Sequence, residues 1–139
     1  MTDKTAAAPM SMYEALTPSI WKIARKVAER LDSSLGSVFK LKEDSSDLGQ
    51  AWISFTHEDV PKSKWFLYLN VTLAEDGKFF GTLQSFVDGD HDDDLGLYTA
   101  SLAQVFDEPY GSVAKMIYDK IVGGAKQAMA EHVDGADAL

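Results

Sequence analysis

Hydrophobic residues in this chain change their spacing from the period of a helix to the period of a strand. Near the start they recur at every third or fourth position, which predicts an amphipathic helix. This apolar stripe consists of Leu16, Ile20, Ile23, Val27 and Leu31. We expect Thr17 to cap this helix, with Pro18 at the first helical position, where a missing N–H costs nothing. Ser33, Ser34 and Gly36 predict its end.

A period of two then predicts four half-buried strands, at about 39–42, 51–56, 65–73 and 79–87. The clearest strand places Trp65, Leu67, Leu69, Val71 and Leu73 on one face, and Phe66, Tyr68, Asn70 and Thr72 on the other. Asp76-Gly77 tolerates positive φ angles, so it predicts a hairpin between 64–73 and 78–87. Gly81 lies among large aromatic residues, which predicts a bulge or a close approach of the backbone.

The rest of the chain has a weaker pattern. Residues 88–94 are expected to form an acidic loop, and residues 95–106 a helix, with a strand from Leu97 as the alternative. Ser112 is expected to cap a final helix, which Gly123 and Gly124 weaken or end.

These elements predict an α+β fold with an N-terminal helix, a four-stranded antiparallel meander and two C-terminal helices packed on the sheet. We expect Leu67, Leu69 and Ile53 in its core. We also expect a single domain over residues 11–131, between a disordered arm at 1–10 and a disordered tail at 132–139.

Charge and composition restrict the function. The 139 residues carry 13 Lys and Arg against 22 Asp and Glu, a net charge of −9, which argues against direct binding of nucleic acid. No apolar stretch is long enough to span a membrane, and residues 1–12 lack the apolar core of a secretory signal, so we expect a cytoplasmic protein without membrane contact. The absence of cysteine excludes disulfides, thiolate metal sites and cysteine nucleophiles.

The second face of the predicted sheet is unusually aromatic for a face that meets water. Trp52 and Tyr68 lie on it, with aromatic residues of the strand at 79–87 beside them. An apolar patch of more than a few hundred Å2 usually marks a contact surface. We predict that this face and nearby acids bind a protein partner, unless the C-terminal helix covers it. The predicted partner-binding residues are Trp52, Tyr68, Asp92, Asp93 and Asp94.

The acidic segment 88–94 has carboxylates at alternate positions, as loops that bind hard cations do. Its candidate calcium ligands are Asp88, Asp90 and Asp92. The segment departs from an EF-hand loop, because Asp93 stands where glycine is needed and Thr99 where a bidentate glutamate is needed. The alternative is a solvated turn that binds no metal, and we expect no other cofactor.

Motifs for catalysis are absent from the sequence. We find no G-x-S-x-G nucleophile motif, no glycine-rich phosphate loop and no H-E-x-x-H zinc motif. His91 next to Asp92 is typical of a phosphohydrolase metal dyad, but only His57 and His132 remain as further histidine ligands. An enzyme is therefore disfavoured.

A basic stripe on the first helix consists of Lys22, Arg25, Lys26 and Arg30. We expect it to be the solvated face of an amphipathic helix. The alternative is a docking site for an acidic partner, including the acidic segment of a second copy of the chain.

Three functions are compatible with these observations. The first is a small acidic, non-enzymatic protein-binding module, such as an adaptor or chaperone-like homodimer. In size, acidity and element order the chain resembles secretion-chaperone-type α+β domains. The second is an inhibitor that mimics nucleic acid, such as a phage anti-defence protein. The third is a metal-dependent hydrolase or a calcium-stabilised domain that uses Asp88–Asp94.

Overall fold

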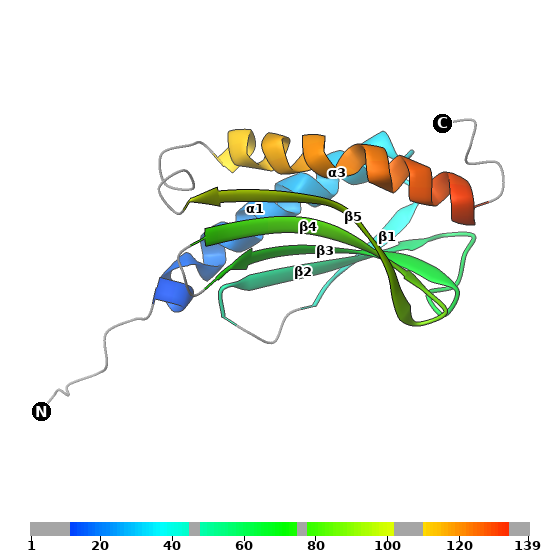
Figure 1. Cartoon of the computed structure of the whole chain (residues 1–139), viewed down its shortest axis with the longest axis horizontal. Coiled ribbons are helices and arrows are strands. Elements are labelled where there is room, and N and C mark those ends of the chain that lie inside the picture. Colours follow the sequence, from blue (N-terminus) through cyan, green and yellow to red (C-terminus); the bar gives the residue numbers. More distant parts are fainter. Residues whose placement is uncertain (1–11, 45–47, 75–77, 102–109, 134–139) are drawn as a thin grey trace, which may run out of the picture.

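A computed structural model shows one antiparallel sheet with two long helices against it (Figure 1). It describes residues 12–44, 48–74, 78–101 and 110–133. The elements are α1 (Met12–Ser34), β1 (Phe39–Glu43), β2 (Gln50–His57), β3 (Trp65–Leu73), β4 (Lys78–Val87), β5 (Asp90–Ser101) and α3 (Tyr110–His132). The strands lie in sequence order, as a meander. The predicted α+β class is confirmed, whereas the predicted arm at 1–10 and residues 134–139 of the predicted tail lie outside the described residues.

The helices form one layer on one face of the sheet, which we call the inner face. α1 packs on β2 and β3, α3 packs on β4 and β5, and the two helices contact each other. The odd-numbered residues of β3, which point at the helices, are only 0–3% exposed. Ile53 and Leu83 extend this core to the neighbouring strands. The predicted core residues Leu67, Leu69 and Ile53 are therefore confirmed, because burial of apolar area stabilises this arrangement.

The predicted hairpin between β3 and β4 is confirmed, and its strands pair from Trp65 opposite Val87 to Leu73 opposite Phe79. Both strands place every second side chain on the inner face, as the alternation of the sequence requires. The turn predicted at Asp76-Gly77 lies outside the described residues.

The first helix begins at Met12, about six residues earlier than expected, so Pro18 lies inside it. Thr17 is not its cap. The Thr17 hydroxyl instead donates to the Tyr13 carbonyl oxygen one turn back and accepts a hydrogen bond of 2.8 Å from the Gly49 N–H. Thr17 thus ties α1 to the start of β2. The predicted end is confirmed at Gly36, whose φ of 92° is the left-handed conformation of a helix C-cap.

The acidic segment is mostly strand, so the predicted loop at 88–94 is wrong beyond its first two residues. Asp88 and Gly89 have φ angles of 53° and 86°, and Val87 pairs with Asp90 across them. Two positive φ angles in a two-residue loop are the geometry of a tight hairpin turn. The following aspartates hide this hairpin from sequence analysis, because Asp is depleted in strands.

The predicted helix at 95–106 is also wrong, because its described part continues β5 as far as Ser101. The strand from Leu97, the alternative, is confirmed by pairing with β4. The sheet therefore has five strands in place of four, and the described residues contain one C-terminal helix in place of two. Residues 102–109 lie outside them.

Glycines allow α3 to lie in close contact with the backbone of β5. A Cβ atom added at Gly124 would overlap the carbonyl oxygen of Leu95, and one added at Gly96 would overlap that of Lys120. The backbones therefore touch at points where a larger residue would hold them apart.

Two further glycine predictions have clear outcomes. α3 runs through Gly123 and Gly124 to His132, so these glycines do not end the helix. On β4, a Cβ atom added at Gly81 would lie 2.9 Å from the Ile117 side chain, which confirms a close approach there.

Neither of the two described helices has the length and the apolar composition that a membrane span requires.

We predict that Leu69→Ala lowers the free energy of unfolding by about 2–5 kcal/mol, because it leaves a cavity in a fully buried position. Tyr68→Ala is the matched control on the opposite face and should cost much less. Urea unfolding of both variants checks the prediction. A larger loss for Tyr68→Ala would mean that the faces of the sheet are assigned the wrong way round.

We predict opposite effects for two adjacent glycines of α3. Gly123→Ala should stabilise the protein by up to about 1 kcal/mol, because a Cβ atom there meets no other atom and alanine favours a helix. Gly124→Ala should destabilise it, because the backbone of Leu95 leaves no room. Thermal unfolding measures both. Equal effects of the two substitutions would contradict the close contact between α3 and β5.

Candidate functional site

The candidate site lies on the face of the sheet opposite the helices, which we call the outer face. The even-numbered residues of β1 to β4 point to this side, and their side chains form rows across the strands. One such row, the Tyr68 row, contains Lys42, Ser54, Tyr68, Gln84 and Asp94. The next row, the Trp52 row, contains Trp52, Asn70, Thr82 and Leu97.

Five rings form a continuous aromatic band over this face. The aromatic band consists of Trp52, Tyr68, Phe66, Phe86 and His91. The ring centroids of Trp52 and Tyr68 are 4.7 Å apart, and those of Phe66 and Phe86 are 4.9 Å apart in a stacked pair. His91 lies edge-on to Phe86 at 5.7 Å. The four largest rings are partly exposed, so the band offers apolar area to solvent.

The two partner-binding aromatic residues predicted from the sequence therefore lie together. The Trp52 indole N–H donates to Gln50 Oε1 at 2.9 Å, and the Tyr68 hydroxyl donates to Asp44 Oδ2 at 2.9 Å. Partial burial of Tyr68, and then its hydrogen bond to Asp44, raise the pKa of its hydroxyl to about 12. These bonds restrict the orientation of both rings, which are partly exposed.

A shallow groove of about 390 Å3 lies beside the aromatic band, over β3, β4 and β5. Its lining combines amides, hydroxyls and one carboxylate with two apolar side chains. These residues are Asn70, Thr72, Phe80, Thr82, Gln84, Asp94 and Leu97. Leu97 is 55% exposed, so the groove has a free apolar wall.

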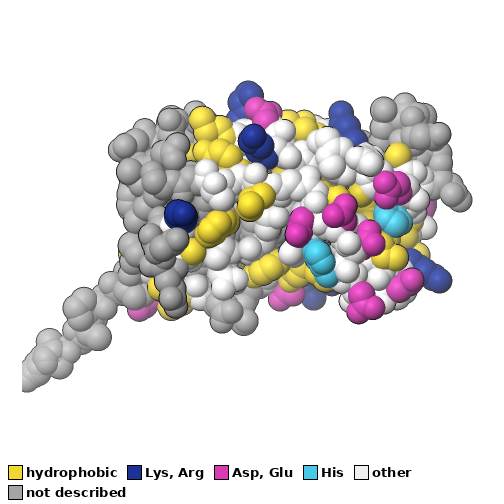
Figure 2. Space-filling model, in the orientation of Figure 1, with side chains coloured by type: hydrophobic (Ala, Val, Ile, Leu, Met, Phe, Trp, Pro, Cys, Tyr) yellow, Lys and Arg dark blue, Asp and Glu magenta, His cyan; other side chains and the backbone are white. Residues whose placement is uncertain are grey.

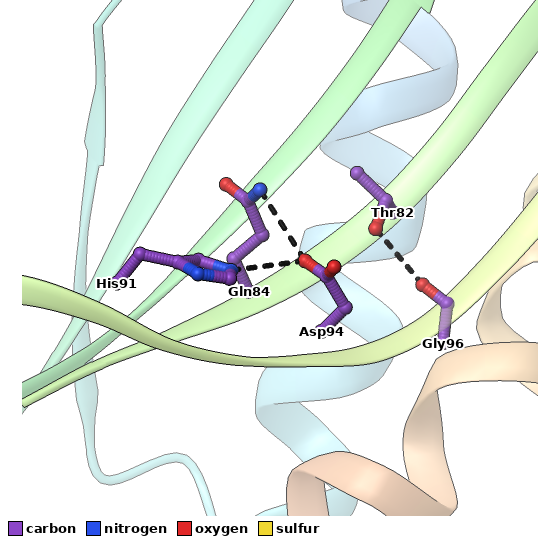
Figure 3. A network of polar contacts seen from close by, with 5 residues as sticks. All are labelled: Thr82, Gln84, His91, Asp94 and Gly96. Atoms are coloured by element: carbon purple, nitrogen blue, oxygen red, sulfur yellow. Dashed lines mark hydrogen bonds and ion pairs between the residues drawn. The ribbon is translucent and has the colours of Figure 1, made fainter.

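A polar network forms the end of this groove nearest the β4–β5 turn (Figure 3). Asp94 lies between Gln84 and His91, and its Oδ1 is 3.0 Å from His91 Nε2 and 3.4 Å from Gln84 Nε2. The Thr82 hydroxyl donates to the Gly96 carbonyl oxygen at 2.9 Å. The network holds a carboxylate on the outer face beside an imidazole.

The three aspartates that the sequence predicts as partner-binding residues do not lie together. Asp94 lies on the outer face, whereas Asp92 and Asp93 line a hollow of about 50 Å3 next to α3, with Ser85 and Glu131. Ordinary strand alternation places Asp93 and Asp94 on opposite faces. Asp92 is separated from Asp94 by the register shift between Ser85 and Phe86, which leaves Asp92 without a partner on β4. Figure 2 shows acidic side chains (magenta) gathered near this hairpin.

The candidate calcium ligands Asp88, Asp90 and Asp92 do not form a metal centre in this structure. In the part of the chain that is described, no three His, Asp or Glu residues form a group that could hold a metal ion. Asp88 belongs to the turn and the other two to the edge strand. The histidines are also dispersed: His57 is buried against Phe39 and His132 stacks on Trp65.

The basic stripe of α1 is partly neutralised by contacts inside the chain. Arg25 forms a bidentate ion pair with Glu43 of β1, with N–O distances of 2.8 and 3.0 Å. Their hydrogen bond lowers the pKa of Glu43 and raises that of Arg25. Arg30 lies over the ring of Tyr118. Because these side chains already have partners, the stripe is a weaker docking site than its sequence suggests.

The sequence predicted Asp94 as a partner-binding residue, but not Gln84 and His91, which form the network with it. The sequence feature that could have placed these residues on a strand is the two-residue turn at Asp88-Gly89, because this turn sets the register of β5 against β4. Without the bulges in β5, however, that register alone would not bring His91 and Asp94 to the same face.

Compared with models of protein families, with curated proteins and with solved structures, the chain matches none.

We predict that Tyr68 ionises near pH 12, and that Asp44→Asn brings its pKa closer to the ordinary value of 10. A pKa raised in the folded state stabilises the fold below pH 10, and this contribution is lost as the pH rises to about 12. The difference in tyrosinate absorbance between wild type and Tyr68→Phe, followed as a function of pH, measures the pKa of Tyr68. Ionisation of Tyr68 at pH 10 would contradict the contact with Asp44.

Proposed function

We propose that this protein is a non-catalytic binding module whose outer sheet face docks another protein chain. The observation that carries the proposal is the aromatic band, which lies on the face opposite both described helices. Trp and Tyr are enriched among the residues that dominate binding energy at protein interfaces. Their rings supply a large contact area and lose little conformational entropy.

The surroundings of the band have the composition of an interface. Next to it lie the amides and hydroxyls of Asn70, Thr72 and Gln84, which can form hydrogen bonds across a contact. Charged groups stand at the margins, with Lys42 on β1 and Asp94 on β5. Marginal charges mainly set the rate and orientation of an encounter, while the central rings set the affinity.

The shape of the site favours a protein over a small molecule as the ligand. The aromatic band crosses four strands, and the groove beside it is shallow. Sites for small ligands usually enclose most of the ligand surface, which an open sheet face does not do.

A second candidate is the nucleic-acid mimic, because the first half of β5 carries Asp90, Asp92, Asp93 and Asp94 in exposed positions. Such a line of carboxylates could replace the phosphates of a nucleic acid in a basic cleft. The two candidates place the binding energy on different residues, and this allows them to be distinguished.

We predict that Trp52→Ala weakens binding to a protein partner, recovered by affinity capture from the native host, by about 2 kcal/mol, or about 30-fold. Met116→Ala is the matched control, because Met116 is an exposed apolar residue on α3. Calorimetry measures both.

The triple substitution of Asp92, Asp93 and Asp94 by Asn should mainly slow association, since exposed charges act on the encounter. The mimic predicts the reverse: the triple substitution abolishes binding, with a steep loss as salt rises, and Trp52→Ala has little effect. That result would replace the proposed function with the mimic.

A further inference from the structure

On the basis of the proposed function, we infer that the chain that covers the outer face is a second copy of this protein, related by a two-fold axis parallel to β3. In such a face-to-face dimer β3 lies over β3, β2 over β4, and β1 over β5. The register of the sheet then decides which side chains meet.

Charge complementarity supports this arrangement. The Tyr68 row begins with Lys42 on β1 and ends with Asp94 on β5, with Tyr68 in the middle. Rotation about an axis along β3 reverses the row. Lys42 then faces Asp94 of the second copy, at both ends of the interface. A two-fold axis perpendicular to the strands would instead place Lys42 near Lys42 and Asp94 near Asp94.

Shape complementarity supports the same axis. In the Trp52 row, the large ring lies on β2, while the groove extends from β3 over β4 and β5. The rotation that pairs Lys42 with Asp94 also places Trp52 over Thr82 of the second copy, beside Leu97. Each Trp52 then enters the groove of the other copy and covers Leu97, whose side chain is 55% exposed in the single chain.

The size of the face sets the strength of the dimer. Five strands about 4.8 Å apart and about seven residues of about 3.3 Å give a face of roughly 550 Å2, so a dimer buries roughly 1,100 Å2 in total. This area lies at the low end for specific interfaces, and we expect a reversible dimer with a Kd in the micromolar range.

The test reverses the two charges that the axis brings together. Sedimentation equilibrium of the full chain should show a monomer–dimer equilibrium. Lys42→Glu and Asp94→Lys should each weaken dimerisation by about tenfold or more, because each places like charges opposite one another. The variant with both substitutions should restore it, because the pair is then attractive again. Glu29→Lys is the matched control and should change nothing, because Glu29 is exposed on α1, on the other side of the sheet.

Each other outcome overturns the inference in a distinct way. A wild-type chain that stays monomeric excludes the second copy as occupant. A dimer that is unaffected by either single substitution uses another surface. Single substitutions that weaken the dimer without rescue by the pair exclude this axis. A monomeric chain whose captured partner still depends on Trp52 would leave the proposed function intact, so the two failures are distinguishable. Circular dichroism of each variant verifies its fold.

Discussion

The packing of both helices against one face of the sheet determines what the other face can do. β3 supplies the centre of this contact, since its inner residues are almost fully excluded from water. α3 is held particularly close, because Gly96 and Gly124 let its backbone touch β5. Both described helices pack their apolar sides on the inner face. Among the described residues, the rings of the outer face are therefore in contact with solvent.

The acids of β5 have a structural role that is independent of any partner. An edge strand presents unpaired backbone groups, and proteins protect such edges with charges and bulges. β5 has both, with carboxylates at Asp90, Asp92 and Asp93 and two shifts of register against β4. These features hinder association through the β5 edge of the sheet. The acidic run is therefore explained without assigning it a metal or a mimicked nucleic acid.

Much of the fold was predictable from hydrophobic spacing. Leu67 and Leu69 alternate so regularly with polar and aromatic neighbours that the strand, its buried face and its hairpin follow from sequence alone. The same alternation of side chains placed Trp52 and Tyr68 on one face of the sheet. β5 was not predictable in this way, because pairing with β4 outweighs the poor strand propensity of its aspartates. The separation of Asp94 from Asp93 follows from ordinary alternation, whereas its separation from Asp92 depends on a bulge, which no periodicity reveals.

The most direct test of a binding outer face is backbone NMR of the full chain over a range of concentrations. If the outer face contacts a second chain, the amide signals of Trp52, Tyr68, Thr82 and Leu97 should shift together as the concentration rises. Those of Lys115 and Lys126, on the exposed side of α3, should stay fixed. Shifts confined to α1 and α3 would contradict this account of the protein, because they would place the contact on the helical layer.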